Sequence, residues 1–341
     1  MSESCLIIAE AGVNHNGDPG LARELIRVAA EAGADIIKFQ TFRAEALVTA
    51  RAEKAAYQAK ATAQGESQLD MLRRLELPPE EFFRLAQYAQ EQGIGFLSTP
   101  FDLESLALLA RMELPLIKIP SGEITNLPYL RELAAHNWDV VLSTGMSEPV
   151  EVEAALRVLE AAGKPPSAVT LLHCTTEYPA PPDQVNLRAM RSMREAFPRC
   201  AGVGYSDHTQ GIDVALAAAA LGASVLEKHF TLDKSLPGPD HKASLCPEEL
   251  RAMVRGVRNI TLALGSARKE VVPVERANRL LVRKSIVAAR DIAAGEILSA
   301  ENLTTKRPGT GLSPMHWDDV IGKRAVRAIH RDEFIKNSFM A

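Results

Sequence analysis

The chain has 341 residues, of which 46% are hydrophobic, and interspersed acidic and basic residues give a net charge of −4. A chain of this length and composition can bury a large core, and we expect one large domain and a smaller one. The weak, mixed charge offers no basic surface for nucleic acid, and the longest apolar stretch, residues 214–226, is shorter than the roughly 20 residues that cross a bilayer.

The cysteines and the amino terminus indicate the compartment. The four cysteines are scattered without close pairs, which argues against a disulfide framework or a zinc knuckle. No basic-then-apolar leader precedes the first apolar run. We therefore expect a cytoplasmic protein that acts on a small molecule.

Eight short apolar runs recur along the chain, with residues of the kind that carry chemistry at their ends. They are LIIAE ending at Glu10, DIIKFQ at Gln40, GFLST at Thr99, LIKIPSGE at Glu123, VVLSTG at Gly145, VTLLHCT at Thr175, VGYSDH at His208 and VLEKHF at Phe230. Strand-like runs that alternate with helical segments predict a parallel sheet, and eight of them are what a (β/α)8 barrel needs. In that fold the active site forms where the strands end.

Helical patterns lie between these runs. Asp18 and Pro19 form an N-cap and a first-turn proline, and an apolar stripe then continues to a helix stop at Gly33. Segment 42–77 is much longer than a usual strand-to-helix connection and is rich in Ala, Gln, Lys and Glu, so we predict a lid beside the barrel mouth. Further helices are predicted over residues 79–92, 103–112, 128–136, 149–162, 187–197, 212–221 and 247–264.

The composition changes after residue 265. Residues 266–282 have the character of a linker, and residues 283–341 show short strands and tight turns without crossover helices. We expect a TIM-barrel catalytic domain over residues 1–265 and a separate small β-rich domain over residues 283–341. On spacing alone, that domain could equally be a dimerisation or capping module.

Two lysines, Lys38 and Lys118, lie inside otherwise apolar strands. An unpaired ammonium group in a barrel interior would cost several kcal/mol, so each lysine must meet an anion. One alternative is an internal ion pair with Glu10 or Glu123.

The other alternative is a bound anion. Ser121 and Ser206 follow nearby strands and supply hydroxyl donors. Two lysines that converge with hydroxyl groups suit phosphate and carboxylate. This interpretation indicates an anionic substrate.

Two histidines, His208 and His229, close neighbouring strands and should present both imidazoles at the same rim. Imidazoles with open positions suit Mn, Zn or Fe-type divalent ions, and a harder ion is possible if waters complete the shell. The loop PGPDHK, residues 237–242, follows the last strand, and its Asp240 and His241 either reach back over the site or form a simple solvated turn.

The ends of the runs resemble motifs of the N-acetylneuraminate synthase family, over nearly the whole chain. The matching segments are AEAGVNHNG from Ala9, KFQTF from Lys38, STPFD from Ser98, KIPSGE from Lys118, LSTGM from Leu142, HCTTEYP from His173, YSDHT from Tyr205, EKHFT from Glu227 and GPDHKAS from Gly238. The resemblance implies a (β/α)8 barrel followed by an antifreeze-like (SAF) domain, which RKSIVAARDIAAGEIL to KRPGTG resembles.

What the resemblance implies is the condensation of phosphoenolpyruvate with an open-chain 2-acetamido sugar, with Mn²⁺ or Mg²⁺ as cofactor. We expect N-acetylmannosamine as the acceptor and N-acetylneuraminate as the product. The TTEYPAP and SGEITNLP patterns also resemble synthases of N,N'-diacetyllegionaminate, whose acceptor is 2,4-diacetamido-2,4,6-trideoxymannose, and this is the alternative.

The resemblance also implies roles for particular residues. The family's metal ligands match His208 and His229, and its catalytic carboxylate for the attacking water matches Glu123. Glu10 matches a carboxylate that holds acceptor hydroxyls. The remaining matches line the substrate pocket, and they are Lys38, Lys118, Ser121 and Ser206 around phosphoenolpyruvate, with Tyr178, Glu227 and Asp240 beside them.

Two further positions follow from the resemblance. Arg307 in KRPGTG matches an arginine that reaches the acceptor's N-acetyl group from the other subunit, so we expect a homodimer in which each small domain caps the partner's barrel. Thr176 occupies a position that is asparagine in some sialic acid synthases, where it contributes to the phosphoenolpyruvate pocket. Threonine is shorter but still donates a hydroxyl.

Two other functions are open from the residues. A barrel aldolase or lyase would use Lys38 or Lys118 as a Schiff base. A non-catalytic sugar-binding protein would have kept the scaffold while losing at least one of the catalytic residues, and none is missing.

Overall fold

The computed structural model describes residues 5–62 and 65–341. Residues 1–4, at the expected leaderless amino terminus, and residues 63–64, within the expected lid, lie outside this part. The chain divides into two compact units, residues 1–265 and residues 266–341. No helix in the described ranges is long and apolar enough to span a membrane.

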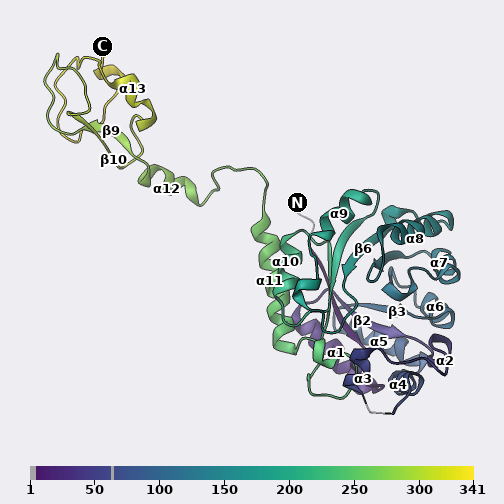
Figure 1. The fold of residues 1–341 in the computed structure, drawn as a ribbon. Coiled ribbons are helices and arrows are strands. Elements are labelled where there is room, and N and C mark those ends of the chain that lie inside the picture. Colours follow the sequence, from purple (N-terminus) through teal and green to yellow (C-terminus); the bar gives the residue numbers. More distant parts are fainter. Residues whose placement is uncertain (1–4, 63–64) are drawn as a thin grey trace. The chain divides into compact units, whose positions relative to one another are not determined.

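The first unit is a barrel of eight parallel strands surrounded by helices (Figure 1). The strands are hydrogen-bonded in the order β3-β2-β1-β8-β7-β6-β5-β4, and β3 also contacts β4, so the sheet closes. The (β/α)8 prediction is therefore confirmed. The strands are β1 (Leu6–Gly12), β2 (Ile36–Thr41), β3 (Gly95–Pro100), β4 (Leu116–Ile119), β5 (Asp139–Ser143), β6 (Val169–Cys174), β7 (Gly202–Asp207) and β8 (Val225–His229).

The surrounding helices begin and end close to the predicted positions. The Asp18 side chain accepts a hydrogen bond from the backbone of Gly20 (2.6 Å), and Gly33, with a φ of 80°, ends the first helix. The helices are α1 (Pro19–Ala32), α5 (Pro79–Glu91), α6 (Leu103–Ala110), α7 (Leu127–Ala134), α8 (Pro149–Ala161), α9 (Ala189–Ala196), α10 (Asp213–Ala220) and α11 (Pro247–Leu264).

The barrel interior has an apolar floor and a polar layer above it. Alternate residues of a strand face the same side, so each interior position recurs two residues later. The floor is a cluster of buried residues on five strands: Ile8, Leu97, Val141, Leu172 and Val225. Two residues further along four of these strands come the polar side chains of Glu10, Thr99, Ser143 and Glu227, all buried. The alternation of side chains along each strand thus places a layer of polar side chains directly above the apolar floor.

Three short helices form the long connection after β2. They are α2 (Ala44–Leu47), α3 (Ala56–Ala61) and α4 (Gln68–Leu75). Helices α2 and α4 share a buried cluster with Val13 and Phe42, here called the lid cluster, which consists of Val13, Phe42, Ala44, Met71, Leu72 and Leu75. This segment therefore folds as a small layer rather than as an irregular loop.

The second unit has its own core. Its strands β9 (Ser285–Ala288) and β10 (Leu303–Lys306) pair antiparallel, and α13 (Trp317–Val320) packs with them around a buried cluster that includes Ile286 and Leu298. Helix α12 (Glu275–Val282) lies within the segment expected as a linker, residues 266–282.

Candidate active site

A cavity of about 180 Å³ lies at the carboxyl ends of the barrel strands, as the fold leads one to expect. The residues that line it come from several strands and from the lid. Of the candidates named from the sequence, it is lined by Glu10, Lys38, Lys118, Ser121, Thr176, Tyr178, Ser206, His208, Glu227 and His229.

The other three candidates lie elsewhere. Asp240 lines a neighbouring cavity. Glu123 follows β4 in a 3-10 helix, Ser121–Glu123, where its carboxylate accepts a hydrogen bond from Asn126 (2.6 Å). Arg307 belongs to the second unit, where it is exposed after β10. Burial raises the pKa of Glu123, so this carboxyl holds a proton more readily than an exposed one.

Two lysines and two carboxylates form a buried network in the cavity. Lys38 Nζ lies 2.8 Å from Glu10 and 3.5 Å from Glu227, and Lys118 Nζ lies 3.8 Å from the other carboxylate oxygen of Glu227. The internal ion pair considered for Lys38 is thus present with Glu10, whereas Lys118 faces Glu227 rather than Glu123. Both lysines still line the cavity, so the ion pairs do not remove them from a bound anion.

The pKa values of the two carboxyl groups in this network are shifted in opposite directions. Burial raises the pKa of Glu10 to about 7, although the Lys38 ammonium opposes the rise. Burial alone would also raise the pKa of Glu227, but the ammonium groups of Lys118 and Lys38 outweigh it and lower the value to about 2. Glu227 is therefore a fixed counter-charge, while Glu10 can exchange a proton near neutral pH.

Hydroxyl groups surround the ammonium groups. Lys38 donates a hydrogen bond to Thr99 Oγ1 (3.0 Å), and Lys118 donates to Ser143 Oγ (2.6 Å). The Thr176 hydroxyl, which lies close to Gly145 after β5, is buried without a hydrogen-bond partner among the described residues. A buried donor without a partner is costly unless a ligand completes it, and charged donors beside hydroxyls suit an oxyanion.

His208 and His229 meet at the rim, with ring centroids 5.6 Å apart. His208 Nδ1 donates to the Thr175 carbonyl (2.6 Å), because a carbonyl oxygen only accepts, and Nε2 therefore keeps its lone pair. Burial lowers the pKa of His208 to about 4 and that of His229 well below its usual value, so both rings are neutral at pH 7. Neutral imidazole is the form that binds a metal.

The donor set around these histidines fits a metal with an incomplete protein shell. His229 Nδ1 is buried, has no hydrogen-bond partner in the part of the chain that the structure describes, and lies 3.8 Å from an Asp240 carboxylate oxygen. Among residues 5–62 and 65–341, no group of three or more His, Cys, Asp and Glu side chains is arranged to hold an ion. Two imidazoles would leave coordination positions to substrate and water, as catalytic metal sites do.

Sequence reasoning gave no role to several residues of the cavity. Gln40 and Thr99 end apolar runs, and Ser143 lies two residues after a floor residue, so the strand pleat could have found them. Tyr57 comes from the lid and contacts Tyr178, with ring centroids 4.9 Å apart. Hydrophobic periodicity cannot predict a residue such as Tyr57, which reaches the site from a connection between strands.

A second cavity, of about 280 Å³, adjoins the first. The two share five lining residues, Gln40, Tyr57, Phe101, Tyr178 and His229. Five residues of the lid cluster, Val13, Phe42, Met71, Leu72 and Leu75, line part of the rest of its wall. The expected lid therefore bounds the site directly.

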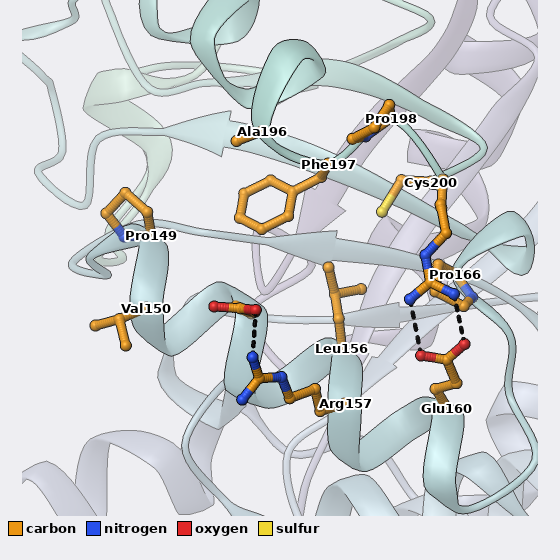
Figure 2. Close-up of a pocket in the computed structure, with 12 residues that line it drawn as sticks. Pro149, Val150, Leu156, Arg157, Glu160, Pro166, Ala196, Phe197, Pro198 and Cys200 are labelled. Carbon is orange, nitrogen blue, oxygen red and sulfur yellow. Dashed lines mark hydrogen bonds and ion pairs between the residues drawn. The ribbon is translucent and has the colours of Figure 1, made fainter.

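Another hollow, of about 470 Å³, lies outside the barrel, between α8 and α9 (Figure 2). Its apolar lining includes Leu156 and Phe197, and its charged groups are satisfied by each other, as in the ion pair of Arg199 with Glu160 (2.7 Å). It contains none of the strand-end groups described above, so we place the chemistry in the strand-end cavity.

Comparison with known proteins identifies the family of this chain. The model of the NeuB family matches residues 25–269, and the model of the SAF domain matches residues 283–339. The chain belongs to the NeuB family. It is thus a phosphoenolpyruvate-dependent nonulosonic acid synthase with a C-terminal SAF domain. The resemblance seen in the motifs is confirmed, and the aldolase and binding-protein alternatives are not retained.

Named members of the NeuB family span almost the whole chain. An N,N'-diacetyllegionaminic acid synthase from Campylobacter jejuni is 54% identical over 97% of this chain and 98% of its own length. Another, from Legionella pneumophila, is 46% identical over 95% of this chain and 91% of its own length. The crystal structure of an N-acetylneuraminic acid (sialic acid) synthetase from Leptospira borgpetersenii has a TM-score of 0.70 at 32% identity and covers 81% of this chain and 90% of that one.

Proposed function

We propose that this NeuB-family synthase condenses phosphoenolpyruvate with 2,4-diacetamido-2,4,6-trideoxymannose to give N,N'-diacetyllegionaminate and phosphate. The 54% and 46% identities to proteins named for that product, against 32% to a sialic acid synthetase, favour this acceptor. The relatives thus favour the alternative product over N-acetylneuraminate, the first expectation from the motifs.

The observation that carries the proposal is the meeting of two buried ammonium groups and two neutral imidazoles in one cavity. Lys38 and Lys118 would hold the phosphate and carboxylate of phosphoenolpyruvate, with hydroxyl donors from Ser121, Ser206 and Thr176. The same groups would neutralise charge as phosphate departs, which is where fixed donors contribute most to catalysis.

The reaction forms a carbon-carbon bond to the aldehyde and a carbon-oxygen bond to water, and it breaks the carbon-oxygen bond to phosphate. The methylene carbon of phosphoenolpyruvate attacks the open-chain aldehyde, whose oxygen takes up a proton. Water then adds to the former enol carbon, and phosphate leaves with its bridging oxygen, so that a 2-keto acid remains. In our proposal Glu123 accepts the proton of this water, and Glu10 holds the acceptor's hydroxyls.

We propose His208 and His229 as the ligands of a divalent ion, Mn²⁺ or Mg²⁺. Such an ion would supply Lewis-acid polarisation of the aldehyde oxygen. Tyr178, whose ring stacks on His208 at 4.1 Å between centroids, would hold that imidazole in place. Glu227 would favour the charged form of both lysines, because its carboxylate lies close to both, and for Lys118 it opposes the burial that lowers the pKa.

The first test measures phosphate release from phosphoenolpyruvate with Mn²⁺, comparing the 2,4-diacetamido acceptor with N-acetylmannosamine, with and without EDTA. We expect release that requires the diacetamido sugar and stops in EDTA, because the two imidazoles alone cannot polarise the aldehyde. Mn²⁺ added back should restore it. Faster release with N-acetylmannosamine would return the assignment to N-acetylneuraminate, and full activity in EDTA would exclude the metal role.

A further inference from the structure

The two adjoining cavities divide the site into a charged part and a part that the lid lines with both apolar and polar residues. The first contains the lysines and the polar layer of the barrel. The second is reached past His229 and Tyr178, which line both. If phosphoenolpyruvate fills the first cavity and the aldehyde end of the acceptor sugar lies at the imidazoles, the other end of the acceptor is directed to the second cavity.

Aliphatic side chains of the lid form part of the wall of the second cavity. Its apolar residues come from the lid and from the loops after β1 and β3, and they are Val13, Phe42, Leu47, Val48, Met71, Leu72, Leu75 and Phe101. The polar groups of the cavity belong to other lining residues, which are Gln40, Tyr57, Gln58, Gln68, Tyr178, His229 and Asp240. The aliphatic lid residues bind a methyl group well, and they offer no partner to a hydroxyl that faces them.

We infer that the second cavity binds the distal half of the acceptor, carbons 4 to 6, and that its aliphatic wall selects a 6-deoxy sugar over one with a 6-hydroxyl. The inference rests on the proposed function. The 6-methyl group packs against Leu47 and Val48, while the amide side chains of Gln58 and Gln68 serve the 4-acetamido group. The lid thus determines which acceptor sugar is joined to phosphoenolpyruvate in the barrel.

The size of the selectivity follows from the chemistry of the wall. A hydrophobic pocket rejects an added hydroxyl only moderately, by about a hundredfold at most, because the hydroxyl loses hydration without meeting a clash. We expect kcat/KM for 2,4-diacetamido-2,4,6-trideoxymannose to exceed that for its 6-hydroxy counterpart by about 10- to 100-fold.

The test replaces one methyl group of the wall by a hydroxyl. Val48 is half-buried, and Val48→Thr keeps the shape of the side chain while giving a 6-hydroxyl a hydrogen-bond partner. We expect this variant to reduce the 6-deoxy preference by about three- to tenfold, through a lower KM for the 6-hydroxy sugar, with KM for phosphoenolpyruvate unchanged. The matched control is Val150→Thr, on α8, where the side chain is 68% exposed, and it should leave the ratio as it is.

A larger side chain gives a second readout. Leu47→Phe should narrow the cavity and raise KM for the diacetamido acceptor without changing that for phosphoenolpyruvate. If the natural enzyme uses the diacetamido acceptor but neither variant changes the acceptor parameters, the cavity assignment is wrong and the proposed function stands. If neither sugar releases phosphate from the natural enzyme, the proposed function and this inference both fail.

Discussion

At the scale of single residues, Gly145 shows how closely the hydroxyls of the site are packed. Its backbone N–H donates to Ser121 Oγ (2.9 Å), and an added Cβ would lie 2.3 Å from Thr176 Oγ1. Gly145→Ala must therefore displace both hydroxyls from the anion cradle. We expect KM for phosphoenolpyruvate to rise and kcat/KM to fall by about a hundredfold, since misplacements near 1 Å have effects of this size.

Gly122 provides the control for this prediction. It lines the same cavity, but a Cβ built there meets nothing within 4 Å. Gly122→Ala should keep KM for phosphoenolpyruvate within about twofold, because nothing must move. Equal effects of the two substitutions in steady-state kinetics would show that the hydroxyls at Gly145 do not bind the anion.

At the scale of elements, β7 and β8 are joined behind the two histidines by a buried ion pair. Lys228 Nζ lies 2.8 Å from Asp207, both side chains are fully buried, and Asp207 also accepts hydrogen bonds from Thr209. Because successive residues of a strand face opposite sides, this pair lies outside the barrel wall while His208 and His229 face inward. It fixes the strand ends that present the imidazoles.

Lys228→Met should lower the free energy of unfolding by about 3 to 5 kcal/mol, because it leaves Asp207 as an unpaired buried charge. Urea unfolding of the metal-free protein measures the loss. The double variant Asp207→Asn with Lys228→Met removes the charge as well and should recover part of the stability. A Lys228→Met protein as stable as the natural one would show that the pair does not hold the two strands.

At the scale of the whole molecule, each unit has its own hydrophobic core, so a defect in one need not unfold the other. Arg307→Ala should raise KM for the acceptor if the second unit completes the partner's site.

Mixing Arg307→Ala with Gly145→Ala chains, followed by subunit exchange, should restore about a quarter of the natural activity, because half of the dimers would be mixed and each would have one intact site. Activity that stays at the level of the separate variants would exclude a site shared between subunits.

The strand and helix pattern was predictable because hydrophobic periodicity reflects burial directly. The same periodicity placed Lys38, His208 and His229 at the barrel mouth. Strand periodicity does not fix the position of Glu123, because the chain turns into a 3-10 helix after β4, where this carboxylate accepts a hydrogen bond from Asn126. Tyr57 was not predictable for a different reason, since its position depends on how the lid packs.

The lid cluster has a consequence for how such enzymes diversify. The lysines and carboxylates of the site are carried by strands whose spacing the barrel fixes, whereas the aliphatic lid residues belong to the connection after β2, which shares a separate buried cluster. Substitutions there can accumulate without disturbing the reaction, because connections tolerate change better than the strands they join. Changes in this one connection could therefore adapt the enzyme to another acceptor sugar, while the strand-end residues that carry out the reaction stay the same.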